Sequence, residues 1–382
     1  MKFNTVKLGE YLYIKGRIGW KGLKKKEYLE KSEFRIINGE SLTENGIDWN
    51  KAGYISKERY YESPEIMLQP DDILISKDGT IGKIGYVSSL DTPTTVASGI
   101  FVIRNQKPEI INTRFIYHFF CSKYFKNFIT MRTEGSVIPH LYQKDFVDLD
   151  FPLPELSVQN RIVGLLDAIC NKIDLNKSIN NNLEQQVSAL YQSWFEDFEI
   201  TNGVCPENWC YQELSTIANI ASGKRPPAKS DICNEETPIS IVGAAAIMGF
   251  TSEANHTDKI LVTGRVGTHG IIQRFNTPCW TSDNTLVITS PYYEFTNQIL
   301  HRIDYSSMNR GSTQPLITQG DMKKTVVLVP DDDTLAKFEK LAGSLMAKWE
   351  SNNKENVKLA SLRDTLLPQL MSGELDVSDI EL

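Results

Sequence analysis

The sequence predicts an α+β protein built as a pseudo-twofold tandem repeat, in which a mixed globular unit followed by one long helix occurs twice. Three observations predict this fold class. Short motifs recur in both halves of the 382-residue chain, two long segments have a helical pattern, and a proline precedes each of these helices. A chain of this length has room for two or more domains.

The repeat is visible as pairs of matching motifs at corresponding places. In each half an acidic turn leads into a buried strand pattern, and a Gly-Thr pair follows. Further along, a Gly-Ser segment recurs at an offset of 176 residues, and the same offset maps Pro154 onto Pro330. The paired segments are 71–76 with 258–263, 79–80 with 267–268, and 135–139 with 311–315.

The globular units have the alternating pattern of short strands. Residues 112–131 are instead helical and rich in aromatic side chains, most of which we assign to the core rather than to a platform that stacks bases. Runs at 147–153 and 325–329 end just before the long helices. The remaining strand segments are 34–38, 73–76, 84–88, 99–104, 239–242, 260–263 and 285–289.

The first long helix is predicted from about residue 158 to 198, where Gly164 is the only glycine and no proline occurs. Its apolar residues recur with a heptad period, and residues 331–333 fit the N-cap of the second helix. Arg363 occupies one heptad position of the second helix, so we expect it at the rim beside an acidic residue. The matched positions are Ile162, Leu166, Ile169, Ile173, Leu183, Val187, Leu190 and Trp194 with Phe338, Ala342, Leu345, Trp349, Leu359, Arg363, Leu366 and Leu370.

Two asparagines interrupt the apolar seam of each helix, Asn176 and Asn180 in the first, Asn352 and Asn356 in the second. If the helices pair antiparallel, the four amides meet and fix the register. A slip by one heptad would leave amides unpaired, at a cost of about 1–3 kcal/mol each. The alternative is that they face water at the seam edge. Their recurrence in both helices favours the register role.

The net charge of −7 argues against a generally basic nucleic-acid-binding surface, but the distribution of charge matters more. Residues 15–26 hold several lysines and an arginine and no acidic residue, whereas the C-terminal tail is acidic. The basic segment can contact phosphates, or it can be a solvated loop kept soluble by its lysines.

Nothing in the sequence indicates a membrane or secreted protein. No stretch approaches the ~20 apolar residues that span a bilayer, and no leader is visible. The six cysteines are scattered and read as reduced thiols, which favours a cytoplasmic protein. Cys205 and Cys210 lack the further ligands of a zinc site, so no metal is predicted.

Catalytic motifs are not found. The chain has no phosphate-binding GxxxxGK[ST] loop and no Asn-Pro-Pro-Tyr type segment of an adenine methyltransferase, and its histidines lack metal-ligand spacing. We therefore predict no catalytic residue and favour a binding protein over an enzyme.

Small-residue loops with basic side chains are the candidates for DNA contact. Residues 77–83 and 264–270 occupy corresponding places, and their glycines allow a backbone to approach a phosphate closely. Each can equally be a tight hairpin turn. Arg, Asn, Gln, Ser and Thr are the side chains that read base edges in a groove, and several of them occur in and near these loops. The candidate residues are Arg17, Lys21, Lys24, Lys25, Lys77, Thr80, Lys83, Arg132, Ser136 and His140 in the first unit, and Lys224, Arg225, Arg265, Thr268, His269, Arg274, Arg310 and Ser312 in the second.

With these segments in view, the sequence resembles the specificity subunits of type I restriction–modification systems, over nearly its whole length. The stretches that carry the resemblance are 17–23, 71–85, 153–195, 222–226 and 366–375. The resemblance implies two target-recognition domains of mixed sheet or half-barrel type, at 1–154 and 201–331. It also implies that spacer helices at 155–200 and 332–382, the second with the acidic tail, form an antiparallel coiled coil.

The same resemblance implies a non-catalytic role. Each domain would read one half of a split site on double-stranded DNA, and two methyltransferase subunits and the translocating nuclease subunits would dock on the chain. S-adenosylmethionine, ATP and magnesium would bind those partners, with no cofactor on this chain. Two other classes remain open: a stand-alone DNA-processing enzyme with a cryptic active site, and a coiled-coil adaptor that binds protein but not DNA.

Overall fold

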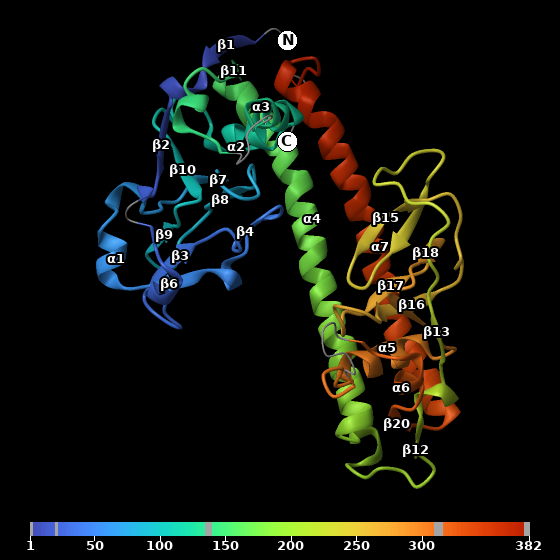
Figure 1. Ribbon diagram of the computed structural model, residues 1–382. Helices are drawn as coiled ribbons and strands as arrows, with labels where there is room; N and C mark the ends of the chain where they lie inside the picture. Colours follow the sequence, from blue (N-terminus) through green and yellow to red (C-terminus); the bar gives the residue numbers. More distant parts are fainter. Residues whose placement is uncertain (1–2, 20–21, 134–139, 309–315, 378–382) are drawn as a thin grey trace. The chain divides into compact units, whose positions relative to one another are not determined.

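The computed structural model describes residues 3–19, 22–133, 140–308 and 316–377, and the chain forms two compact units (Figure 1). Unit 1 comprises Met1–Leu175 with Glu355–Leu382, and unit 2 comprises Asn176–Lys354. Each unit has its own sheets and core. Both long helices are divided between the units, so each unit contains one segment of each helix.

Unit 1 contains a four-stranded antiparallel sheet with the strand order β2-β10-β7-β8. A three-stranded sheet has the order β6-β3-β9, where β3 is antiparallel to β6 and parallel to β9. A two-stranded ribbon, β1-β11, and a small hairpin, β4-β5, complete it. The bounds are β1 (Asn4–Lys7), β2 (Leu12–Gly16), β3 (Phe34–Ile37), β4 (Leu42–Thr43), β5 (Gly46–Ile47), β6 (Gly53–Ile55), β7 (Ile73–Ser76), β8 (Ile84–Tyr86), β9 (Thr94–Val96), β10 (Ile100–Asn105) and β11 (Asp150–Leu153).

Unit 2 repeats this plan among the described residues, except that it has no counterpart of the hairpin β4-β5. Its four-stranded sheet has the order β13-β19-β16-β17, its three-stranded sheet β15-β14-β18 again combines one antiparallel and one parallel pair, and its ribbon is β12-β20. The predicted tandem repeat is therefore confirmed, and it extends to strands without a sequence match. The bounds are β12 (Cys210–Glu213), β13 (Asn219–Ser222), β14 (Ile239–Val242), β15 (Ile247–Thr251), β16 (Ile260–Gly264), β17 (Gln273–Phe275), β18 (Cys279–Thr281), β19 (Thr285–Thr289) and β20 (Val326–Val329).

Two of the described α-helices are long, and the others are short. The predicted helix at 112–131 is two short helices separated at Ser122. The long helix α4 continues into a π-helical turn, Gln192–Glu196. The bounds are α1 (Lys57–Tyr61), α2 (Thr113–Cys121), α3 (Lys123–Thr133), α4 (Leu156–Tyr191), α5 (Tyr293–Arg302), α6 (Gln319–Lys323) and α7 (Asp332–Ser372). No helix in the described part is long and apolar enough to cross a membrane.

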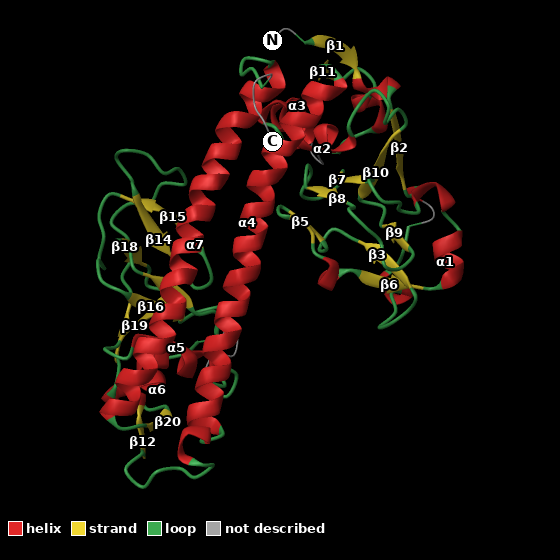
Figure 2. Cartoon of the chain, turned by 180° about the vertical axis from the view of Figure 1, so that it is seen from behind, coloured by secondary structure: helices red, strands yellow, loops and turns green. Residues whose placement is uncertain are grey.

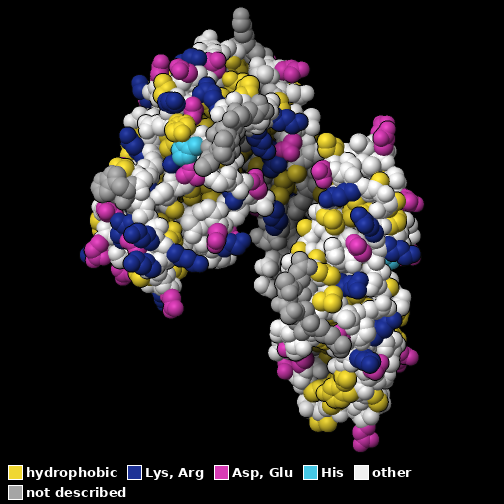
Figure 3. Space-filling view, viewed as in Figure 1, with side chains coloured by type: hydrophobic (Ala, Val, Ile, Leu, Met, Phe, Trp, Pro, Cys, Tyr) yellow, Lys and Arg dark blue, Asp and Glu magenta, His cyan; other side chains and the backbone are white. Residues whose placement is uncertain are grey.

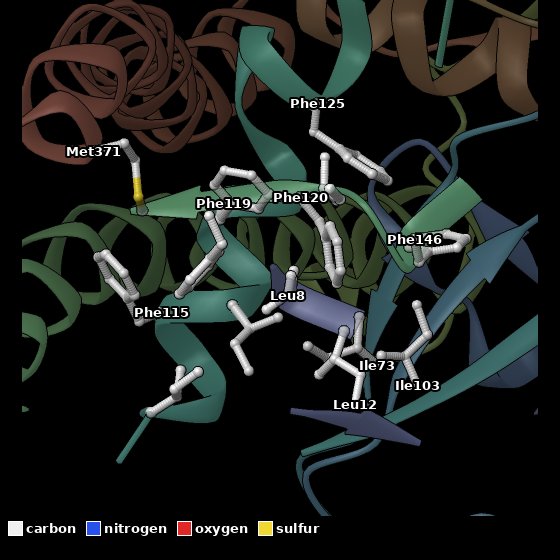
Figure 4. Packing of buried hydrophobic residues seen from close by; sticks show 14 of the residues in the cluster. Leu8, Leu12, Ile73, Ile103, Phe115, Phe119, Phe120, Phe125, Phe146 and Met371 are labelled. Carbon is white, nitrogen blue, oxygen red and sulfur yellow. The ribbon is translucent and has the colours of Figure 1, made fainter. Parts of the chain in front are cut away.

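The core of unit 1 lies between the four-stranded sheet, α2 and α3, and the long helices (Figure 4). Phe115, Phe119 and Phe120 of α2 point into it and are fully buried or nearly so. Met371 of α7 packs on the same cluster. The aromatic side chains of residues 112–131 are thus mostly core, as predicted, and they are not available to stack on bases.

The two long helices are antiparallel within each unit (Figure 2). In unit 1, Lys172 of α4 lies 3.5 Å from the carboxylate of Glu355 of α7. The core of unit 2 combines the end of α4 with the start of α7, where Tyr191 packs on Phe338. Asp331 caps α7 by accepting a hydrogen bond from the Thr334 amide at 3.0 Å, which confirms the predicted N-cap.

Candidate nucleic-acid interface

In unit 1, the loop 77–83 is a tight turn between β7 and β8 that presents small side chains. The Ser76 hydroxyl closes it, donating to the Thr80 carbonyl at 2.6 Å and accepting from the Lys83 amide at 2.9 Å. Gly79 and Gly82 have φ of 68° and 88°, the left-handed conformation that favours glycine. The hairpin alternative describes this geometry correctly, and Thr80 is left exposed at its tip.

A second segment of unit 1 meets this loop. His140 contacts the Asp78 carboxylate through Nδ1, and the Leu141 amide donates to the Lys77 carbonyl at 3.2 Å. Lys77 lies over the Phe101 ring, with Nζ 3.6 Å from Asp78. The fold therefore brings Lys77, Thr80 and His140 together, although they are far apart in sequence.

The basic segment of unit 1 divides into exposed and buried residues. Lys24 and Lys25 are exposed at a 3-10 turn, Lys25–Glu27, and are free to approach a phosphate. Arg17 is instead 3% exposed, and its Nε donates to the Val96 carbonyl at 3.1 Å. Its other nitrogens bond to Ser63 and Thr95. The prediction of Arg17 as a DNA contact is therefore wrong, because its guanidinium is bonded inside the unit.

Two further cationic side chains of unit 1, those of Lys83 and Arg132, interact with neighbouring groups but reach the surface. Lys83 donates to the Gly39 carbonyl at 3.2 Å. Arg132 lies over Phe128 and pairs with Asp145 at 3.0 Å, with its side chain 40% exposed. Neither arrangement excludes a phosphate contact. Lys21 and Ser136 lie outside the described residues.

In unit 2, three loops converge at the edge that corresponds to the loop 77–83. The Arg265 amide donates to the Asn284 carbonyl at 2.8 Å, and the Lys224 amide donates to the Thr281 carbonyl at 2.9 Å. These bonds join residues 222–226, 264–270 and 281–285 into one surface. The packing requires glycine at Gly264, where an added Cβ would lie 1.9 Å from the Thr268 carbonyl oxygen.

Some side chains on this edge of unit 2 have polar atoms that make no hydrogen bond to the described residues. Lys224, Arg225 and Thr268 are exposed. The Nε atom of Arg265, the Nε2 of His269 and the Oγ of Ser282 are buried and make no hydrogen bond. Buried polar atoms are nearly always bonded, so these three atoms are candidates for contact with a ligand or with ordered water. Ser282 was not predicted, because a single serine after a short strand has no distinguishing pattern.

Arg274 does not belong to this surface. Its side chain is 10% exposed, and it forms two hydrogen bonds of 2.7 Å to the Glu294 carboxylate. The guanidinium also lies over the rings of Tyr293 and Trp349. The prediction of Arg274 as a phosphate contact is wrong, because a buried carboxylate already neutralises it. Arg310 and Ser312 lie outside the described residues.

Basic side chains occur on the face of both units that Figure 3 shows, mixed with acidic ones. This distribution agrees with the net charge of −7 and with local rather than continuous basic surfaces. In the described part of the chain, no group of three or more His, Cys, Asp or Glu side chains is placed to hold a metal ion.

Comparison with known proteins finds similar sequences and structures. The family model described as "Type I restriction modification DNA specificity domain" matches residues 2–185. The MjaIX specificity subunit of Methanocaldococcus jannaschii is 25% identical over an alignment of 336 positions, which covers 78% of this chain and 76% of that protein. The chain is thus similar to type I restriction enzyme specificity subunits over most of its length.

Further similar proteins match most of the chain. The HindI specificity subunit of Haemophilus influenzae is 20% identical over an alignment of 408 positions, which covers 81% of this chain and 87% of that protein. The crystal structure of the type I restriction–modification S subunit from M. genitalium superposes with a TM-score of 0.57 at 17% identity, covering 99% of this chain and 97% of that one. The predicted two-domain fold with long helices is thus shown.

The asparagines of the long helices make specific contacts within unit 2. Asn352 Nδ2 donates to Asn180 Oδ1 at 2.8 Å, and Asn180 Nδ2 donates to Asn353 Oδ1 at 2.9 Å. Asn352 and Asn176 are each 1% exposed, whereas Asn356, in unit 1, is half-buried. Asn180 and Asn352 therefore do not face water at the seam edge. Asn353 was not predicted, because it lies one residue off the heptad seam.

Arg363 lies at the rim of the helix pair in unit 1. Its Nε donates to the Asp364 carboxylate at 2.9 Å, and its side chain is 35% exposed. The acidic partner is therefore the adjacent residue of the same helix, α7.

Proposed function

We propose that the chain is the sequence-specific DNA-recognition subunit of a type I restriction–modification complex, in which each unit reads one half of a split site. The observation that carries this proposal is the repetition of one strand order with different loops. The same edge of the four-stranded sheet presents Lys77, Thr80 and His140 in unit 1, and Arg265, Thr268 and His269 in unit 2. A common frame with different side chains suits two readers of different sequences.

The candidate residues divide by the chemistry of their DNA contacts. Lys24, Lys25, Lys224 and Arg225 are exposed cations that suit phosphates, which position a protein without reading sequence. Thr80, His140, Arg265, Thr268 and His269 suit base edges, where hydroxyl, imidazole and guanidinium groups find donors and acceptors. The half-sites would be centred about one helical turn, ~34 Å, apart so that both readers approach the same side of the duplex.

The partners of this chain would supply the chemistry. Two methyltransferase subunits with S-adenosylmethionine, and the nuclease subunits with ATP and magnesium, would dock on a chain that itself has no catalytic residue. Similarity to type I restriction enzyme specificity subunits supports this division of labour.

The asparagines of the spacer helices would fix the helix register, and with it the separation of the readers. The supporting contact is the buried hydrogen bond between Asn180 and Asn352. An amide pair of this kind favours one register, because displacement leaves both amides buried without partners.

Methylation mapping tests the function directly. The chain is expressed with its methyltransferase in a host without other modification systems, and methylated adenines are located by sequencing. We expect a split motif with one methylated adenine in each half. A continuous motif would contradict the two-reader arrangement.

Two biochemical outcomes would favour the other functional classes. Cutting or methylation of DNA by the purified chain alone would establish a stand-alone enzyme. Absence of salt-dependent DNA affinity in the presence of the partner subunits would establish a protein adaptor.

A further inference from the structure

In each unit, a carboxylate from a long helix binds the short helix behind the four-stranded sheet. We call this sheet the reading sheet, and its loop at 77–83 or 264–270 the reading loop, because the proposed function assigns DNA reading to them. In unit 1 it is Asp167 of α4, which binds α2, and in unit 2 it is Glu339 of α7, which binds α5. The short helices α2 and α5 follow equivalent strands, β10 and β19. The long helix and the short helix are therefore connected through side-chain donors of α2 in unit 1 and through backbone amides of α5 in unit 2.

In unit 1 the Asp167 carboxylate accepts hydrogen bonds from two side chains of α2. Arg114 Nε donates to it at 3.1 Å, and a second Arg114 nitrogen contacts the other oxygen. His118 Nε2 lies 2.7 Å away, and because an ionised carboxylate only accepts, this ring nitrogen is the donor. His118 is 2% exposed, so the contact is shielded from water.

The Arg114 guanidinium extends this connection to the reading sheet. It lies 4.4 Å from the ring centroid of Tyr86 and 4.8 Å from that of Tyr117. Tyr86 belongs to β8, the strand that follows the loop 77–83. Contacts therefore run without interruption from α4 through Asp167 and Arg114 to the strand that supports the loop.

In unit 2 the Glu339 carboxylate caps α5 from outside that helix. Its oxygens accept from the backbone amides of Glu294 at 3.1 Å and Phe295 at 2.8 Å. The N-cap residue of α5, Tyr292, makes no side-chain capping bond, whereas α2 is capped by its own Asn112. The first turn of α5 thus depends on a group supplied by the long helix.

The helix α5 in turn holds the strand that ends at the reading loop of unit 2. The Tyr293 hydroxyl donates to the Ile260 carbonyl at 3.1 Å, at the start of β16. The loop 264–270 begins where β16 ends. Movement of the first turn of α5 would therefore move the strand from which Arg265 and His269 extend.

We infer that Asp167 and Glu339 are positioning residues, which hold each reading loop at a set angle to the long helices and so sharpen the preference for one gap length between half-sites. Neither carboxylate contacts DNA in this account, and the base preference of each half-site stays with the loops. The inference rests on the proposed function, since it presupposes a split site.

The test compares gap preference with base preference in the same preparations. Complexes of the full chain with its methyltransferase subunits are assayed on duplexes with the mapped site, with gaps one base pair shorter or longer, and with single base changes in each half. For Asp167→Ala and Glu339→Ala we expect the affinity ratio between the natural gap and the altered gaps to fall by about fivefold, the loss that follows when a buried charged acceptor is removed. Base preferences within each half should stay as in the wild type.

Conservative variants and a matched control sharpen the comparison. Asp167→Asn and Glu339→Gln keep an accepting oxygen. Their affinity ratios between the natural gap and the altered gaps should therefore lie between those of the alanine variants and the wild type. Glu184→Ala removes an exposed carboxylate from α4 and should leave the gap preference unchanged. Each ratio is measured on one preparation. A smaller fraction of folded protein therefore affects both affinities equally and does not change their ratio.

Two results would overturn the inference: wild-type gap preference in both alanine variants, or a loss of base preference in parallel with gap preference, which would indicate general structural damage. A wild-type complex without preference for any split site would instead overturn the proposed function.

Discussion

Single lysines at the surface of unit 1 are expected to act through charge alone. Lys25 is exposed at a 3-10 turn, so Lys25→Ala should weaken binding to specific and non-specific DNA equally. The slope of log affinity against log salt concentration should fall by about one unit, as one phosphate contact is lost. Titrations of the complex at several salt concentrations measure this. Loss of discrimination between sequences would show instead that Lys25 reads bases.

The free energy of unfolding at acidic pH should depend on the ionisation of Asp167. Burial opposes its ionisation, but hydrogen bonds from His118 and Arg114 outweigh burial and lower its pKa to about 2, from the ordinary 3.8. A lowered pKa means that the ionised form stabilises the fold. This stabilisation is complete above about pH 4 and is lost as the pH falls towards 2.

The variant Asp167→Asn should therefore be less stable than the wild type by about 2 kcal/mol at pH 7, and the difference should narrow by pH 3. Denaturant unfolding of the full chain at both pH values measures it, with Glu184→Gln as the control for removal of an exposed charge. A difference that stays constant between the two pH values would contradict the assignment of the lowered pKa.

Among the elements, the asparagine pair of α4 and α7 gives a sharp test of the helix seam. Asn352→Leu leaves the buried Asn180 oxygen without its donor and should destabilise the protein by about 1–3 kcal/mol. The double variant Asn180→Leu with Asn352→Leu removes both partners and should recover most of this loss. Thermal unfolding compares them, with Asn181→Leu on the exposed side of α4 as the control. Stabilisation by Asn352→Leu alone would contradict a paired amide.

The elements also show what a sequence pattern can predict. The strands β7, β14, β16 and β19 were predicted because each is a run of mostly β-branched or leucine residues, and β7, β16 and β19 are buried along most of their length. Strands β9 and β18 have three residues each and were missed, since their pairing is with β3 and β14, far away in the chain. A pattern in one segment has no information about a distant partner.

The whole molecule explains why the candidate site was predicted only in part. The repeat located the loops 77–83 and 264–270 at one edge of equivalent sheets, which the strand order confirms. Arg17 and Arg274 were assigned wrongly because the groups that bind them, Val96 and Glu294, are distant in sequence. Whether a cation is free to meet a phosphate depends on such long-range contacts.

We propose that unit 1 and unit 2 read different halves of one split site. The most direct measurement is methylation mapping of a variant in which Arg265, Thr268 and His269 of unit 2 are replaced by alanine. We predict that one half of the motif stays as in the wild type, while the other becomes degenerate at positions that lose about 1–3 kcal/mol of discrimination each. Equal degeneration of both halves, or an unchanged motif, would contradict the claim.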